Sequence, residues 1–118
     1  MKKNLESKAT QAAKRFLELR EYQVLDTIKR KGSTWIVAEQ DDTIVFCKLS
    51  VSEIGLPKPA FNRFEFETVA AKYLDEHDLP DRTVRGDRLD FHLLPNDRAF
   101  LRHTRAASSA AVEEALAS

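Results

Sequence analysis

Cysteine is almost absent from this sequence, and neither sign of charge is in excess. Cys47 is the single cysteine, so no disulfide can form within the chain, and its place in the apolar run 43–47 predicts a buried thiol that acts as a small hydrophobic side chain. The 19 Lys and Arg residues balance the 19 Asp and Glu residues. Composition therefore supplies no attraction of the whole molecule to nucleic acid or anionic membranes, and a basic surface must be local.

Long hydrophobic runs are also lacking. Polar residues recur throughout 5–20, so we expect neither a signal peptide nor a membrane span, and no membrane partner. A chain of 118 residues supports one ordinary core. We therefore expect a cytoplasmic protein with one α/β domain over residues 1–107, followed by an Ala- and Ser-rich tail over 108–118.

The spacing of apolar residues predicts the order of helices and strands. In chain order we expect a helix over 5–20, a strand over 22–28, strands over 34–38 and 43–47, a helix through the apolar positions of 61–74, and strands over 89–93 and 100–103. The continuous apolar runs favour central strands, whereas the alternation in 89–93 predicts a half-exposed strand. The second helix favours a parallel crossover. The sequence thus predicts a mixed sheet of about five strands flanked by helices.

Several short segments share their order and spacing with a known family. They are AKRFLE at 13–18, YQVL at 22–25, GSTWIVA at 32–38, DTIVF at 42–46, AAKYL at 70–74, VRGD at 84–87 and HTRA at 103–106. In this order, over roughly residues 5–107, the chain resembles the YraN-like family of the restriction-endonuclease-like superfamily. The resemblance implies a restriction-endonuclease-like sheet and a link to DNA or RNA.

The residues that such nucleases use for catalysis are changed in this chain. Where the superfamily has a helix Glu, a strand Asp and a Glu-x-Lys pair, this sequence has Thr10, Trp35, Lys48 and Ser50. An ammonium group at Lys48 repels Mg²⁺, and the indole of Trp35 offers no oxygen ligand. The resemblance therefore implies a degenerate site with no catalysis, no bound metal and no cofactor.

Three functions stay open at this stage. The first is weak, non-specific binding of nucleic acid by an inactive domain, for which the basic candidates are Lys14, Lys29, Arg30, Lys31 and Lys48. The second is a protein-interaction module with an exposed apolar patch at Phe61, Phe64 or the tail, and a second copy of the chain is a further partner to consider. The third is a metal-dependent nuclease whose carboxylates have moved, with Glu39, Asp41, Asp42 and Glu53 as the available groups.

Some other side chains have both a functional and a structural interpretation. Trp35 is suited to stacking on a base, but its apolar surroundings favour a place in the core. The three histidines are far apart and none has a Cys or His at zinc spacing, so a structural metal site is poorly supported. The resemblance implies a charge pair of Arg85 and Asp87 that anchors a strand, with a substrate-facing Asp87 as the alternative, and it implies a structural role for His103.

Overall fold

The computed structural model describes residues 2–30, 32–52, 61–79, 81–94 and 98–107, with side chains from residue 7 onward. The chain forms two helices and five strands, α1 (Lys2–Leu19), β1 (Gln23–Arg30), β2 (Ser33–Gln40), β3 (Thr43–Ser52), α2 (Arg63–Glu76), β4 (Thr83–Leu94) and β5 (Arg98–Thr104). The tail over 108–118, the segment 53–60, which contains Glu53, and Lys31 lie outside the described residues. Neither described helix is long and apolar enough to cross a membrane.

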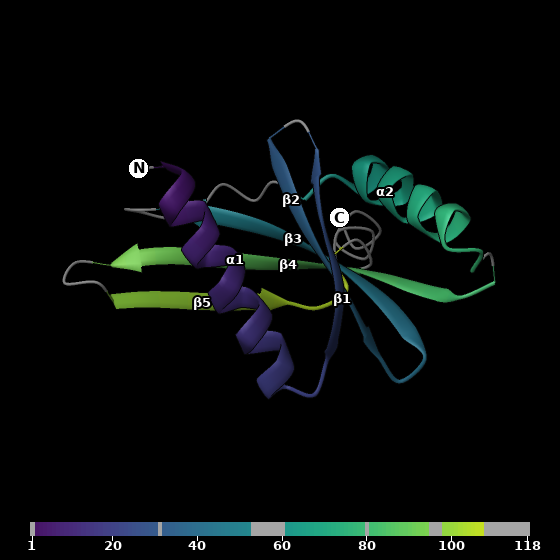
Figure 1. Cartoon of the computed structure of the whole chain (residues 1–118), viewed down its shortest axis with the longest axis horizontal. Helices are drawn as coiled ribbons and strands as arrows, with labels where there is room; N and C mark the ends of the chain where they lie inside the picture. Colours follow the sequence, from purple (N-terminus) through teal and green to yellow (C-terminus); the bar gives the residue numbers. More distant parts are fainter. Residues whose placement is uncertain (1, 31, 53–60, 80, 95–97, 108–118) are drawn as a thin grey trace, which may run out of the picture.

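The five strands form one mixed sheet, as the sequence predicts, and their order in it is β1-β2-β3-β4-β5. Strands β1, β2 and β3 are consecutive antiparallel neighbours, and β5 runs antiparallel to β4. Strand β3 pairs with β4 in parallel, and α2 makes the connection between them (Figure 1). The predicted parallel crossover is confirmed, because parallel neighbours need a long connection that a helix supplies.

The β2–β3 hairpin closes through Asp41 and Asp42. Both residues have positive φ angles, 50° and 65°, and the flanking residues Gln40 and Thr43 pair across the hairpin. Two central residues with positive φ are typical of a type I′ turn, and Asp tolerates this conformation better than most residues. The local sequence therefore uses these two carboxylates to form a turn.

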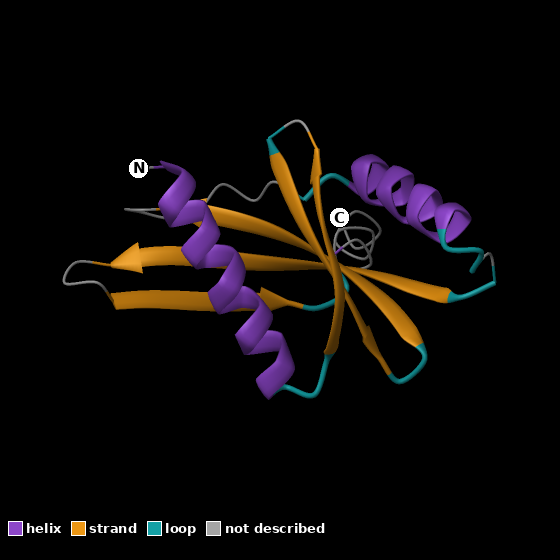
Figure 2. Ribbon diagram, viewed as in Figure 1, coloured by secondary structure: helices purple, strands orange, loops and turns teal. Residues whose placement is uncertain are grey.

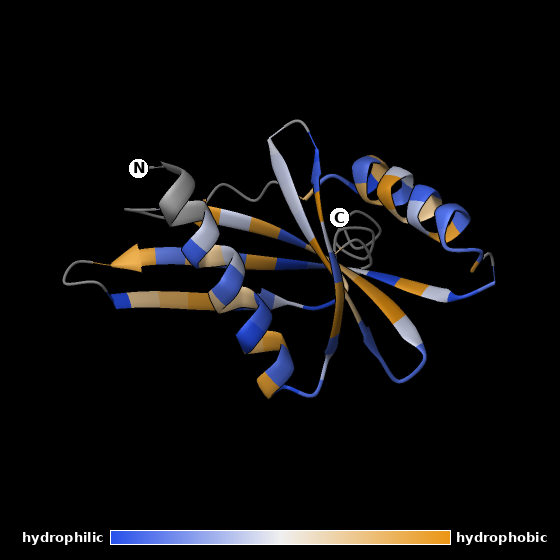
Figure 3. Cartoon of the chain, in the orientation of Figure 1, coloured by the Kyte–Doolittle hydropathy of each residue, from blue (hydrophilic) through white to orange (hydrophobic). Residues whose placement is uncertain are grey.

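Each helix covers a different face of the sheet. The α1 face contains Ala9, Ala13, Leu17, Tyr22, Ile36, Ala38, Val45, Cys47, Leu49, Leu89 and Phe91. The α2 face contains Trp35, Val37, Ile44, Phe46, Phe66, Val69, Ala70 and Tyr73. Successive residues along β2 and along β3 belong alternately to the two clusters. Both strands are therefore covered on both faces, as their apolar runs predict. Figure 2 shows the two helices on the sheet, and both have alternating apolar and polar stretches in Figure 3.

Strand β4 differs from the expectation of a half-exposed strand. Asp87 and Asp90 are both buried, and Asp90 is only 1% exposed. The prediction was wrong because a polar residue was taken to mark a solvent-facing position, whereas Arg88 pairs with Asp90 at 3.1 Å and allows its carboxylate to be buried. The position of β4 between β3 and β5 leaves it no free edge.

The start of α2 places Phe61 and Phe64 in different environments. Asn62 caps the helix by accepting a hydrogen bond from the backbone N–H of Glu65. Phe61 packs against the α2-face cluster, but Phe64 is 77% exposed. Of these two candidates for an exposed apolar patch, Phe64 is therefore the exposed one. Gly86 makes room for this packing, because a Cβ there would lie 2.7 Å from the ring of Phe61.

Candidate anion-binding cleft beside the Asp87–His103 pair

The strand positions that match the nuclease site lie together on the α2 face. Trp35 and Lys48 are direct partners across β2 and β3, and the Lys48 ammonium lies 6.0 Å from the indole centroid. Lys48 also forms an ion pair with Glu65 of α2 at 2.9 Å. Ser50 is two residues further along β3 on the same side, since the register has no bulge there. Thr10 belongs to α1, which packs on the other face of the sheet.

Trp35 is a core residue, as its apolar surroundings predict. Its side chain has no exposed surface, and it packs edge-on against Phe61 and in a stacked arrangement with Phe66. A base cannot reach the indole face without displacing these rings. Stacking of nucleic acid on Trp35 is therefore incompatible with this packing.

The described alternative carboxylates do not converge on Lys48. Asp41 and Asp42 occupy the hairpin turn, six residues along the strands from Trp35 and Lys48, which corresponds to about 20 Å. Glu39 forms an ion pair with Arg82. A metal held by Asp41 or Asp42 would therefore be far from the positions that match the nuclease site.

The predicted basic residues occupy separate places. Lys14 is half-buried on α1, and Lys48 is paired with Glu65. Lys29 and Arg30 line a groove between β1 and α2 that also contains carboxylates, namely those of Asp26 and Glu76. The structure does not bring these described residues into one basic patch.

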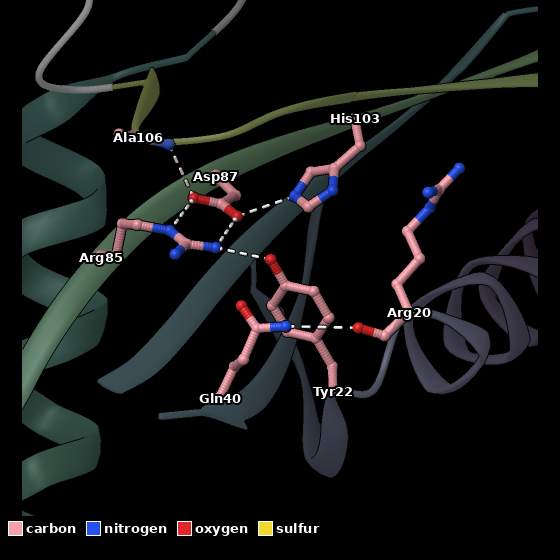
Figure 4. A network of polar contacts seen from close by, with 7 residues as sticks. All are labelled: Arg20, Tyr22, Gln40, Arg85, Asp87, His103 and Ala106. Carbon is pink, nitrogen blue, oxygen red and sulfur yellow. Dashed lines mark hydrogen bonds and ion pairs between the residues drawn. The ribbon is translucent and has the colours of Figure 1, made fainter. Parts of the chain in front are cut away.

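A polar network centred on the buried Asp87 connects β4 and β5 with Tyr22, which lies between α1 and β1 (Figure 4). Asp87 has no exposed surface, and Arg85 donates hydrogen bonds of 2.8 Å to each of its carboxylate oxygens. The backbone N–H of Ala106 donates to Oδ1 at 2.9 Å, and His103 Nε2 lies 2.7 Å from Oδ2. Arg85 also donates to the Tyr22 hydroxyl at 2.7 Å. Asp87 thus holds an arginine, a histidine and the segment after β5 in fixed positions.

This network sets the charge of Asp87. Burial alone would raise its pKa, but the hydrogen bonds from Arg85, His103 and Ala106 and the charge of Arg85 outweigh burial and lower the pKa from its usual value. The same contacts with Asp87 raise the pKa of Arg85. Asp87 is therefore ionised at neutral pH, and an anionic acceptor favours the tautomer of His103 that carries a proton on Nε2.

Cys47, Asp87 and His103 form a group with metal-ligand chemistry. Their ligand atoms lie within 4.8 Å of one another. Burial, followed by the charge of Asp87, raises the pKa of the Cys47 thiol well above its usual value, which opposes the thiolate that a metal requires. Both oxygens of Asp87 already accept hydrogen bonds from the Arg85 cation. The residues therefore fit a packed charge network and do not fit a metal site.

An open cleft lies beside this network. It has a volume of about 450 Å³ and is lined by Phe16, Arg20, Tyr22, Gln40, Leu101, His103 and Arg105. These lining residues include two arginines and a histidine but no carboxylate. The Arg20 guanidinium lies over the Phe16 ring at 4.2 Å, and Gln40 donates to the Arg20 carbonyl at 3.2 Å. The arrangement is suited to binding an anion.

The end of α1 places two of the cleft residues. The backbone N–H of Tyr22 donates to the Leu17 carbonyl and that of Glu21 to the Glu18 carbonyl, both at 3.0 Å, and Glu21 has a φ of 68°. This is the Schellman arrangement, in which a left-handed residue ends the helix and the next residue packs back on it. It buries the Tyr22 ring beside Leu17 and leaves Arg20 at the mouth of the cleft.

Sequence reasoning identified His103 and the Arg85–Asp87 pair but missed Arg20, Gln40 and Arg105. These residues come from the end of α1, the end of β2 and the segment after β5, and no local motif connects them. The charge pair predicted between Arg85 and Asp87 is confirmed. No protein-family model matches this chain, and a search of curated proteins finds no significant match.

Proposed function

We propose that this chain is a cytoplasmic, YraN-like domain of the restriction-endonuclease-like kind that binds nucleic acid weakly and does not cleave it. The observation that carries the proposal is the cleft whose described lining residues include the two arginines Arg20 and Arg105 and no carboxylate. In a molecule with no net charge, such a local excess of cationic groups is what contact with phosphate requires.

The lack of cleavage is supported by the chemistry of the matching nuclease positions. Lys48 places an ammonium where the metal would need an oxygen, and the buried indole of Trp35 lies directly beside it. Glu65, the carboxylate that Lys48 contacts, is already used in an ion pair. The order of helix, three strands, helix and two strands supports the fold assignment.

We predict that the purified protein cleaves neither plasmid DNA, single-stranded DNA nor RNA in the presence of Mg²⁺ or Mn²⁺. The reason is that no oxygen ligands and no water-orienting lysine occupy the matching positions. Gel assays over several hours would check this result. Cleavage that a chelator abolishes, and that is lost in Asp41→Asn/Asp42→Asn but retained in the exposed control Asp81→Asn, would identify a relocated metal site and contradict the proposal.

We also predict salt-dependent binding of single-stranded DNA or RNA through the cleft. If Arg20 and Arg105 each contact a phosphate, the logarithm of the affinity should fall with the logarithm of salt concentration at a slope of about −1.4, since each contact to a single strand contributes about −0.7. Fluorescence anisotropy with labelled oligonucleotides at several salt concentrations measures this slope.

Two charge-matched variants locate the site. Arg20→Gln/Arg105→Gln should reduce the steepness of the slope by about 1.4, because both of these phosphate contacts are lost. Lys29→Gln/Arg30→Gln removes the same charge at the groove beside α2 and should leave the slope unchanged. A slope that stays unchanged in Arg20→Gln/Arg105→Gln but becomes less steep in Lys29→Gln/Arg30→Gln would assign binding to the basic run that begins at Lys29.

A protein-interaction module is the second candidate, and the exposure of Phe64 favours it. This ring lies on the outer side of α2, where it contributes nothing to the core clusters of the sheet. Absence of binding to every form of nucleic acid at low salt would make this the leading function.

A further inference from the structure

We propose that the cleft recognises a phosphate monoester, such as the one at the end of a nucleic-acid strand, in preference to the diesters within the strand. This inference rests on the proposed function for the source of the monoester. Its support comes from the donors in the cleft, the charge of the adjoining surface and the lack of an accessible stacking platform.

Two arginines line the cleft. Arg20 and Arg105 are both exposed, so neither guanidinium is buried in the core. A monoester carries about −1.5 to −2 charges at neutral pH and three strong acceptor oxygens. An arginine side chain can bind two such oxygens in parallel. Concentrated donors of this kind suit a compact dianion better than a chain of single negative charges.

Asp87 fixes the position of His103 at the edge of the cleft. The hydrogen bond to Asp87 occupies Nε2, and the other ring nitrogen lies on the Arg20 side of the ring (Figure 4). Edge contacts with Phe16 and Tyr22, at centroid distances of 6.1 and 5.9 Å, fix the orientation of the ring. His103 therefore forms a rigid polar wall beside the two arginines that line the cleft.

The surface next to the cleft is acidic. Gln40 borders both the cleft and an adjoining depression, whose other lining residues are Glu21, Gln23, Glu39, Asp41 and Asp42. A phosphodiester chain that continued over this depression would meet like charges, which repel it. A nucleic-acid strand whose terminal phosphate lies in the cleft avoids this repulsion. The boundary between basic and acidic surface therefore favours a terminal group.

The aromatic residues of the cleft do not offer a face to a base. The Tyr22 ring is only 6% exposed, and the Arg20 guanidinium lies over the Phe16 ring at 4.2 Å. Base stacking on aromatic side chains is a major source of affinity for single strands. Without it, recognition depends on the phosphate, and the base sequence at the end of the strand should matter little.

The test compares two oligonucleotides of one sequence, one with a 5′-phosphate and one with a 5′-hydroxyl, with the fluorophore at the 3′ end. An oligonucleotide with a 3′-phosphate and the fluorophore at its 5′ end tests recognition of the other end of the strand. We expect at least one phosphorylated end to bind about tenfold more tightly than its hydroxyl counterpart, which is the factor that one charge-assisted hydrogen bond supplies. Nucleoside monophosphates and inorganic phosphate serve as competitors and as ligands in calorimetry.

Arg20→Gln/Arg105→Gln should abolish the preference, whereas Arg63→Gln/Lys72→Gln, with the same change of charge on exposed positions of α2, should retain it. Equal affinity for phosphorylated and hydroxyl ends would overturn this inference and leave the proposed function standing. Binding of monophosphates, lost in the cleft variant, without binding of any oligonucleotide would support monoester recognition and overturn the proposed function. Absence of binding by every probe would overturn both.

Discussion

Replacement of Asp87 by Asn should lower the free energy of unfolding by about 3–5 kcal/mol, the usual cost of removing one partner from a buried ion pair. The carboxylate has no exposed surface, and Asn removes the negative charge that pairs with the Arg85 guanidinium. One of the two acceptor oxygens is also replaced by an NH2 donor, so His103 and the Ala106 N–H cannot both keep their present hydrogen bonds. Urea denaturation followed by circular dichroism measures the change, with Asp81→Asn as an exposed control.

The effect of Asp87 should also depend on pH. Its pKa is lowered in the folded state, so its stabilising contribution is fully present above the unfolded pKa of about 3.9 and is lost as the pH falls through the folded pKa. The stability difference between the wild type and Asp87→Asn should therefore be constant near neutrality and decrease below about pH 4. A difference that grows on acidification would contradict this account.

A double-mutant cycle separates the ion pair from the rest of the network. If the cost of Asp87→Asn comes mainly from the unpaired guanidinium, then Asp87→Asn/Arg85→Gln should be less destabilised than the sum of the two single variants. Additive costs would instead attribute the effect to His103 and Ala106. Either result is obtained from the same denaturation curves.

Trp35→Ala should cost about 3–5 kcal/mol of stability, the range typical of removing a large aromatic side chain from a core. The indole is fully buried and packs against Phe61 and Phe66. Among the described residues its Nε1 has no hydrogen-bond partner. Trp35→Phe should therefore cost much less than Trp35→Ala, because it keeps a ring and removes a buried donor that is not paired.

Trp35 also distinguishes the core interpretation from base stacking. Trp35→Phe should leave the affinity for single-stranded DNA unchanged, since the indole face is covered by other rings. Fluorescence anisotropy titrations measure the affinity of each variant, and denaturation curves measure its stability. A small loss of stability in Trp35→Ala combined with a large loss of affinity would assign Trp35 to the binding surface.

The sequence by itself determined the elements and their general arrangement. Apolar runs in β2 and β3 and helical spacing in α1 and α2 are local patterns, and a local pattern directly reflects which side chains avoid water. The long connection through α2 then required a parallel neighbour for β3. The burial of Trp35 and Cys47 followed from their apolar neighbours in the chain.

Only the tertiary structure decided where the charged side chains meet. The burial of Asp90 depends on Arg88 beside it and on the neighbouring strands, which an alternating pattern cannot reveal. The cleft joins Arg20, Gln40 and Arg105 from three distant segments around His103. Their proximity is set by strand register, by the left-handed end of α1 and by the Asp87 network, and these long-range contacts leave no repeated spacing in the sequence.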